Sequence, residues 1–203
     1  MKAIALHGSP IKGGNSDTLV EHFFKGLQAE EDHGVLHFYT NELDIKPCQG
    51  CLQCNRPPDY RCVIEDDMQQ IYSAFGDADV VVFSTPMYWG YMTAQLKTVV
   101  DRMEAIASEQ YFKGKAIVLV ATYWHHVKST VAFFNRVFPF FGGEVHVITY
   151  CSLDKENRRD VPSSSCKEKL IEAYELKKTS RQVHARVIPS LSNGSVGGTL
   201  IPT

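Results

Sequence analysis

Four of the six cysteines in this 203-residue chain lie in one short stretch. They are Cys48, Cys51, Cys54 and Cys62, so the spacing is C-x2-C-x2-C-x7-C. Thiolates spaced in this way on one loop can ligate a [4Fe–4S] cluster or a zinc ion. The stretch also has a metal-free interpretation, in which Pro47 opens a short helix and the first three thiols share one face that packs against the body. Spacing alone leaves the cluster, the zinc ion and the metal-free helix open.

A second candidate site is the glycine-rich loop of residues 7–16. Backbone N–H groups at the start of a helix attract a phosphate. Side chains of this loop can add donors and a positive charge, and they are Ser9, Lys12, Asn15 and Ser16. The glycines do not follow the dinucleotide spacing G-x-G-x-x-G, and Lys12 precedes a glycine instead of a Ser or Thr, which also excludes a nucleoside-triphosphate loop. We therefore predict an anion site, and the alternative is a turn that binds nothing.

A third segment, residues 85–92, reads T-P-M-Y-W-G-Y-M. Aromatic and thioether side chains next to a proline and a glycine could hold a flat aromatic ligand. Taken alone, Tyr88 and Trp89 would more simply be core or interface residues. Together with the anion loop, they favour a ligand with a phosphate at one end and a planar ring at the other.

Alternating strands and helices must position these segments. Apolar runs typical of strands cover residues 2–7, 35–39, 79–84, 115–122 and 144–150. Helical periodicity covers residues 16–28, 66–75, 93–106, 127–138 and 167–178. The alternation predicts an α/β fold with a doubly wound parallel sheet. In such sheets ligands bind at the carboxyl ends of the strands, so we expect the site at the loops after the first, third and fourth strands.

Two helix boundaries carry local signals. Asp66 with Gln69 three residues later matches a capping box, which predicts Asp66 as the N-cap of the second helix. Pro139 and the Gly142-Gly143 pair predict that the helix of residues 127–138 ends there. This helix and its surroundings are rich in phenylalanine, which predicts a homodimer or a larger homo-oligomer, with a wholly buried helix as the alternative.

The overall composition excludes several classes of partner. A formal net charge of −2 and a pI near 6.4 give no electrostatic basis for binding nucleic acid or an anionic membrane. No apolar run approaches the roughly 20 residues that span a bilayer, and the first residues do not resemble a signal peptide. We expect a cytoplasmic location, where reduced thiols are the rule.

Taken in order, these segments resemble the flavodoxin-like NADPH-dependent FMN reductase superfamily, which includes the iron–sulfur flavoproteins. The matching segments are Gly8-Ser9-Pro10, Asn15-Ser16, 47–54, 62–68, Ala78-Asp79, 86–90, 95–97 and Asp101-Arg102. The likeness covers residues 1–150. It implies a five-stranded parallel sheet of order 2-1-3-4-5 within a domain of residues 1–178, a cysteine-rich insertion at 47–62, and a C-terminal tail at 179–203.

The resemblance also implies bound FMN. Its phosphate would lie at Ser9, Lys12, Asn15 and Ser16. Its ring would lie against Pro86, Met87, Tyr88, Trp89 and Gly90. The fourth-strand loop, which includes Thr122 and Tyr123, would close the other side. Because a flavin itself carries the hydride or electron chemistry, no side chain is predicted to be catalytic.

The function implied is that of an NAD(P)H-dependent FMN oxidoreductase of the flavin or quinone reductase type, which reduces a small-molecule acceptor. One alternative is an iron–sulfur flavoprotein that relays electrons between a carrier such as ferredoxin and FMN, with a [4Fe–4S] cluster on the four clustered cysteines. A second alternative is a carrier or sensor that binds flavin or metal without turnover.

Overall fold

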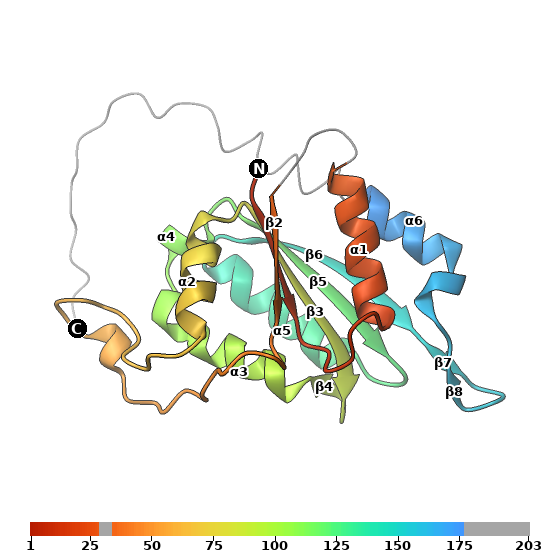
Figure 1. The fold of residues 1–203 in the computed structure, drawn as a ribbon, viewed down its shortest axis with the longest axis horizontal. Helices are drawn as coiled ribbons and strands as arrows, with labels where there is room; N and C mark the ends of the chain where they lie inside the picture. Colours follow the sequence, from red (N-terminus) through yellow and green to blue (C-terminus); the bar gives the residue numbers. More distant parts are fainter. Residues whose placement is uncertain (29–33, 177–203) are drawn as a thin grey trace.

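A five-stranded parallel sheet forms the centre of the molecule (Figure 1). The computed structural model describes residues 1–28 and 34–176, so the predicted tail at 179–203 lies outside the described residues. The strands run in the order β2 (Val35–Tyr39), β1 (Ala3–His7), β3 (Val80–Tyr88), β5 (Ala116–Tyr123) and β6 (Glu144–Cys151). This is the predicted order 2-1-3-4-5, so the α/β fold expected from the sequence is confirmed. A two-residue strand, β4 (Tyr91–Met92), pairs antiparallel with the end of β3.

Helices cover both faces of the sheet. One face carries α1 (Asn15–Gln28) and α6 (Lys167–Glu175), and the other carries α2 (Met68–Asp77), α3 (Ala94–Arg102) and α5 (Lys128–Phe140) (Figure 1). Successive side chains of a strand point to opposite faces, so a strand covered on both sides is apolar throughout. Along β1, Ala3 and Ala5 pack with the α1 face while Ile4 and Leu6 pack with the other face. This explains why the central strands β1, β3 and β5 contain continuous apolar runs, whereas the edge strands β2 and β6 also carry exposed polar residues.

Short elements complete the fold. They are the 3₁₀ turns η1 (Gln53–Asn55), η2 (Met103–Ile106) and η3 (Ser163–Ser165), the helix α4 (Glu109–Phe112), and the hairpin strands β7 (Leu153–Asp154) and β8 (Arg159–Asp160). The sequence patterns did not predict β4 or the β7–β8 hairpin. Within the described residues, no helix has the length and apolar character needed to cross a membrane.

Three helix predictions need correction. The second helix begins at Met68, with Asp67 as its N-cap residue. The predicted capping box is only half formed: the Asp66 carboxylate accepts from the Met68 N–H (3.0 Å), but the Gln69 amide donates to the Ile64 carbonyl (2.9 Å). The helix expected over 93–106 is α3 followed by the 3₁₀ turn η2. The helix expected to end before Pro139 continues through it to Phe140, since a proline in the last turn removes only one intrahelical hydrogen bond.

The phenylalanine-rich helix is only partly buried. Phe134 and Phe138 are buried in the core below β3 and β5, whereas Phe140 is 78% exposed. The alternative of a wholly buried helix is therefore wrong.

Candidate functional site

A cavity of about 760 Å³ opens at the carboxyl edge of the sheet. Its walls come from the loops that follow β1, β3 and β5, with a further contribution from the β7–β8 hairpin. The lining residues are Ser9, Ile11, Gly14, Asn15, Ser16, Pro86, Met87, Tyr88, Trp89, Gly90, Thr122, Tyr123, Trp124, His125, His126, Ser152 and Asp160. The structure thus brings together ten of the eleven residues predicted to bind the cofactor, and Lys12 is the exception.

The first loop is placed by a close approach at Gly8. The Gly8 N–H donates to the Ser84 carbonyl (2.7 Å), and the Gly8 carbonyl accepts from the Thr93 hydroxyl (2.7 Å). A Cβ at this position would lie 2.7 Å from the Cβ of Leu96, closer than real Cβ contacts. Only glycine therefore lets the chain pass between β3 and α3 into the loop. Ser9 follows directly and its hydroxyl accepts from the Ile11 N–H (3.1 Å), which tightens the turn.

A buried polar network lies beneath this loop. The Asp17 carboxylate accepts from the Gly13 N–H (2.9 Å) and contacts His7 Nδ1 (2.8 Å), and both side chains are buried. His7 Nε2 in turn contacts His37 Nδ1 (3.0 Å). Burial lowers the pKa of His37, and the neighbouring His7 ring adds to that lowering. Sequence reasoning missed this network, although a histidine at an inward position of a buried strand was a signal for it.

Three of the predicted phosphate ligands have other partners. The Lys12 ammonium pairs with the Glu42 carboxylate (2.7 Å) and lies 4.2 Å from the centre of the Tyr39 ring, outside the cavity. The hydrogen bond from Lys12 to Glu42 is the main cause of the raised pKa of Lys12. Asn15 does line the cavity, but its amide binds the segment after β6, as described below. The Ser9 hydroxyl donates to the Ile11 carbonyl (3.0 Å). The loop therefore offers an anion the backbone around Gly14 and Ser16 rather than a cation.

The turn between β3 and β4 forms the aromatic wall. Trp89 and Gly90 both have positive φ (51° and 79°), the pattern of a tight hairpin turn. This conformation is costly for a tryptophan, and the Trp89 side chain is fully exposed (104%). At the other end of the wall, the Met87 sulfur accepts from the Thr130 hydroxyl (3.3 Å), which ties the turn to α5. The turn thus holds its aromatic side chains outward at the rim of the cavity.

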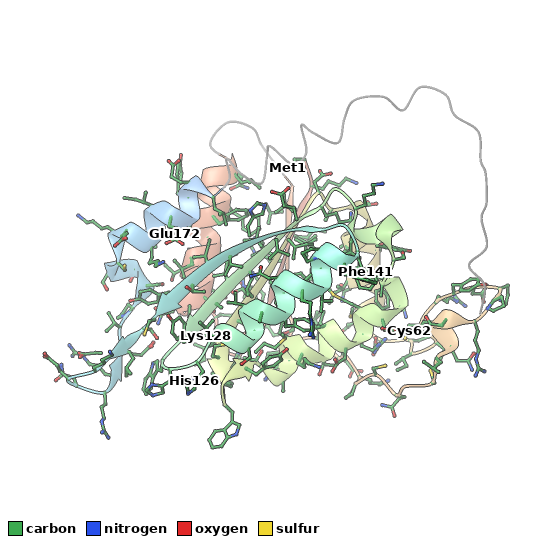
Figure 2. All side chains as sticks on the ribbon, turned by 180° about the vertical axis from the view of Figure 1, so that it is seen from behind. Met1, Cys62, His126, Lys128, Phe141 and Glu172 are labelled. Atoms are coloured by element: carbon green, nitrogen blue, oxygen red, sulfur yellow. The ribbon has the colours of Figure 1, made fainter. Side chains whose placement is uncertain are left out.

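The wall after β5 contains Trp124, His125 and His126, and Figure 2 shows His126 close to the start of α5 at Lys128. Next to this wall lie Ser152 and Asp160, which no sequence motif predicted. Among the described residues that line the cavity, Asp160 carries the formal charge and no Lys or Arg is present. The cavity therefore suits a ligand held by neutral donors and apolar surface.

The cysteine segment lies elsewhere. Figure 2 shows Cys62 on the opposite side of the molecule from His126. Cys48 and Cys51 are exposed, and Cys54 and Cys62 are partly buried. Burial raises the pKa of Cys54, and the nearby Glu104 carboxylate raises it further.

The four predicted metal ligands do not converge. In the described part of the chain, no group of three or more His, Cys, Asp or Glu side chains is arranged to hold a metal ion. The metal-free interpretation is also wrong in its geometry, because η1 begins only at Gln53 and Cys48 and Cys51 are exposed instead of packed against the body. As the thiols lie, they do not fit a four-thiolate centre.

A buried ion pair holds the base of this segment. The Arg102 guanidinium binds both oxygens of the Asp66 carboxylate (2.6 and 3.1 Å), and Arg102 is 1% exposed. The same guanidinium donates to the carbonyls of Lys46 (2.8 Å) and Ile64 (3.2 Å), one on each side of the cysteines. We call these four residues the Arg102 clamp. Burial by itself would raise the pKa of Asp66, but the hydrogen bonds from Arg102 and from the Lys46 and Met68 N–H groups outweigh it and lower that pKa.

Comparison with known proteins places this architecture in a family. Residues 1–149 match the sequence model of the NADPH-dependent FMN reductase family. An iron–sulfur flavoprotein of Archaeoglobus fulgidus is 29% identical over 144 residues, which are 70% of this chain and 64% of that protein. An iron–sulfur flavoprotein of Methanosarcina thermophila is 36% identical over 105 residues, which are 50% of this chain and 52% of that protein. The chain thus spans between half and two thirds of the length of these relatives.

Solved structures share the fold at low sequence identity. The NAD(P)H:quinone oxidoreductase of Methanothermobacter marburgensis superposes with a TM-score of 0.64 at 18% identity, covering 88% of this chain and 95% of that one. A flavodoxin from the domain Archaea superposes with a TM-score of 0.54 at 15% identity, covering 90% and 99%. These likenesses support the flavodoxin-like fold, and the match over residues 1–149 supports the family. The chain belongs to the NADPH-dependent FMN reductase family.

Proposed function

We propose that this protein is an NAD(P)H-dependent oxidoreductase that works through bound FMN. The observation that carries the proposal is the cavity at the carboxyl edge of the sheet. It has an anion loop at one end and an aromatic wall at the other, in a chain that belongs to an FMN reductase family. A cavity of about 760 Å³ is in the usual size range of small-molecule and cofactor sites.

Different residues of the cavity would bind the phosphate and the ring of FMN. Backbone N–H groups around Gly14 and Ser16, at the start of α1, would bind the phosphate, and the Ser9 hydroxyl would join them by rotating away from the Ile11 carbonyl. The β3–β4 turn and Tyr123 would pack against the ring and keep water from it. When bound, FMN supplies the hydride and single-electron chemistry. The chain's own task is then to bind, orient and shield, which agrees with the absence of any predicted catalytic side chain.

The test is binding followed by turnover. FMN should bind with a stoichiometry of one per chain, and the loaded protein should oxidise NADH or NADPH when a quinone or free flavin is supplied. Gly14→Asp would put a carboxylate beside the phosphate and should weaken FMN binding by roughly tenfold or more through like-charge repulsion. Gly34→Asp adds the same charge at an exposed glycine far from the cavity, before β2, and should bind FMN as the unaltered protein does.

Three results would contradict the proposal. The first is a protein that fails to bind FMN. The second is FMN binding without NAD(P)H oxidation, which would favour a carrier or sensor. The third is an equal loss of affinity in both glycine variants, which would place the flavin outside the cavity.

A second candidate, an iron–sulfur flavoprotein with a ferredoxin-type partner, is supported by the names of the relatives. It requires the four cysteine thiols to converge around a cluster, although they do not converge as they lie. Iron and acid-labile sulfide, measured in protein purified without oxygen, decide between the two candidates. Four iron atoms per chain would favour the second candidate, and a flavin spectrum without iron would favour the first.

We also propose that the protein forms a homodimer or a larger homo-oligomer. The exposed Phe140 at the end of α5 is the apolar surface that supports this proposal. Light scattering after gel filtration gives the assembly mass, and Phe140→Glu should lower it.

A further inference from the structure

The β7–β8 hairpin adds a wall to the cavity that lies outside the family match. Residues 1–149 match the family, whereas Ser152 and Asp160 come from the chain that follows. Both residues line the cavity, and Ser152 is buried. The hairpin therefore contributes to the site independently of the family motifs.

The hairpin is fixed to the body by its own hydrogen bonds. At its base, the Ser152 N–H donates to the Tyr123 carbonyl (2.9 Å) and the Val161 N–H donates to the Ser152 carbonyl (2.7 Å). The Tyr150 hydroxyl donates to the Val161 carbonyl (3.1 Å). At its tip, the Asp154 carboxylate accepts from the Glu156 N–H (3.0 Å). A braced hairpin of this kind holds Asp160 in a defined place.

Asp160 bridges two walls of the cavity. One carboxylate oxygen accepts from Asn15 Nδ2 (2.8 Å), at the start of α1, and the other accepts from Trp124 Nε1 (3.1 Å), in the loop after β5. The rest of the Asn15 amide binds the chain just after the hairpin, because Nδ2 also donates to the Val161 carbonyl (3.3 Å) and Oδ1 accepts from the Ser163 N–H. Asn15 is thus an anchor for the hairpin, and this explains why it is not free to bind a phosphate as the sequence predicted.

The Asp160 carboxylate keeps acceptor capacity after these two bonds. A carboxylate has about four lone-pair positions, of which Asn15 and Trp124 use two. In a lining without Lys or Arg, such a group attracts hydroxyl donors and repels anions. A ligand with its phosphate on the first loop and its ring at the β3–β4 turn would have its linker in this cavity, which Asp160 lines beside the first loop. In FMN that linker is a chain of hydroxyl-bearing carbons.

We propose that Asp160 accepts a hydrogen bond from a hydroxyl of the ribityl chain, and so is a cofactor-binding residue supplied by the β7–β8 hairpin. The inference rests on the proposed function, because it assigns a contact to the same cavity. Sugar hydroxyls also occur in the ribose of a nicotinamide nucleotide. The test must therefore separate these two sources.

Riboflavin and lumiflavin make that test direct, because they share the ring, lack the phosphate and differ in the ribityl chain. Asp160→Asn keeps the size and an acceptor for Trp124, and Asp160→Ala removes both oxygens. A hydrogen bond to a charged group contributes more binding free energy than one to a neutral group. Each variant should therefore bind riboflavin roughly tenfold or more weakly than the unaltered protein does. Each should bind lumiflavin within about twofold of the unaltered protein, since the ring contacts stay. Glu156→Gln is the matched control, because it removes one exposed carboxylate from the same hairpin outside the cavity.

The outcomes separate this inference from the proposed function. If the unaltered protein does not bind FMN, the proposed function fails. If it binds FMN while both Asp160 variants bind riboflavin normally, only the inference fails. An equal loss for riboflavin and lumiflavin would show that Asp160 merely braces the cavity, and this also overturns the inference. A raised KM for NADH with unchanged riboflavin binding would assign the contact to the nicotinamide ribose and overturn the ribityl assignment.

Discussion

The ligand cavity and the cysteine segment are both built from loops, but the two regions are positioned by different means. The cavity loops leave the ends of neighbouring parallel strands, so the ladder that pairs β1, β3 and β5 sets their relative positions. The cysteine segment lies between β2 and α2 and is held at its base by the Arg102 clamp. A whole sheet thus orders the cavity, whereas the Arg102 clamp and the neighbouring hydrogen bonds between Asp44 and Asp67 order the chain on both sides of the thiols.

The two regions should therefore differ in how well they tolerate the loss of a single side chain. A side chain of the cavity wall can change while the strands still hold the wall in place. The base of the cysteine segment has fewer contacts, because the Arg102 guanidinium binds both chain ends of the segment and the Asp66 carboxylate at once. Beside it, a few hydrogen bonds, such as those between Asp44 and Asp67, also join the two ends. The following changes test this difference, beginning with the largest expected effect.

Removing the clamp should have the largest effect. Arg102→Met leaves the Asp66 carboxylate buried without its partner, which typically costs about 3–5 kcal/mol of the free energy of unfolding. Urea denaturation measures this loss. Lys97→Met on the same helix breaks an exposed pair with Asp101 and should cost less than about 1 kcal/mol. Similar losses in the two variants would refute the special role of the clamp.

A change at the base of the cavity should cost less stability but should affect the ligand. Gly8→Ala places a Cβ against Leu96 and the Thr93 hydroxyl, and overpacking of this kind costs about 1–3 kcal/mol. The loop should shift, so we expect FMN titration to show weaker binding. Gly34→Ala, which meets no atom within 4 Å, serves as the control. If Gly8→Ala binds FMN normally, the close approach at Gly8 does not place the loop.

Lowering the pH should weaken the Arg102 clamp through protonation of Asp66. The pKa of Asp66 is lower in the folded protein than its ordinary value of 3.8, so the carboxylate stabilises the fold above that value. This stability is lost as the pH falls through the folded-state pKa, because the protonated group gives up its pairing. The free energy of unfolding should therefore decrease less steeply in Asp66→Asn than in the unaltered protein as the pH is lowered below 4. Denaturation at a series of pH values measures this. Parallel pH curves for the two proteins would contradict the assignment.

The thiols themselves should matter least to the fold. Cys48→Ser and Cys51→Ser change exposed side chains and should alter the free energy of unfolding by no more than about 0.5 kcal/mol in the presence of a reductant. A loss of several kcal/mol in either variant would show that a cross-link or a bound metal holds the segment. The thiols, and not the Arg102 clamp alone, would then hold the cysteine segment in place.

Much of the fold could be predicted from the sequence because it rests on local patterns. Apolar runs marked the five parallel strands, and their alternation with helices predicted a doubly wound parallel sheet, while the order of the strands came from the resemblance to the FMN reductase family. The three cavity loops followed from that order, since the carboxyl ends of parallel strands share one edge. The capping box predicted at Asp66 formed only in part, because the Asp66 carboxylate accepts from the Met68 N–H while the Gln69 amide binds the Ile64 carbonyl.

The sequence by itself determined the sheet, the three loops at its carboxyl edge and the family, because these depend on periodicity and on motifs read in order. Only the tertiary structure decided which side chains line the cavity. Lys12 pairs with Glu42, Asn15 anchors a hairpin that begins beyond β6, and Asp160 of that hairpin lines the cavity. Each of these outcomes depends on a hydrogen bond or an ion pair between side chains that lie apart in the sequence. Such partners leave no periodic trace in the sequence, and they become visible only when the chain has folded.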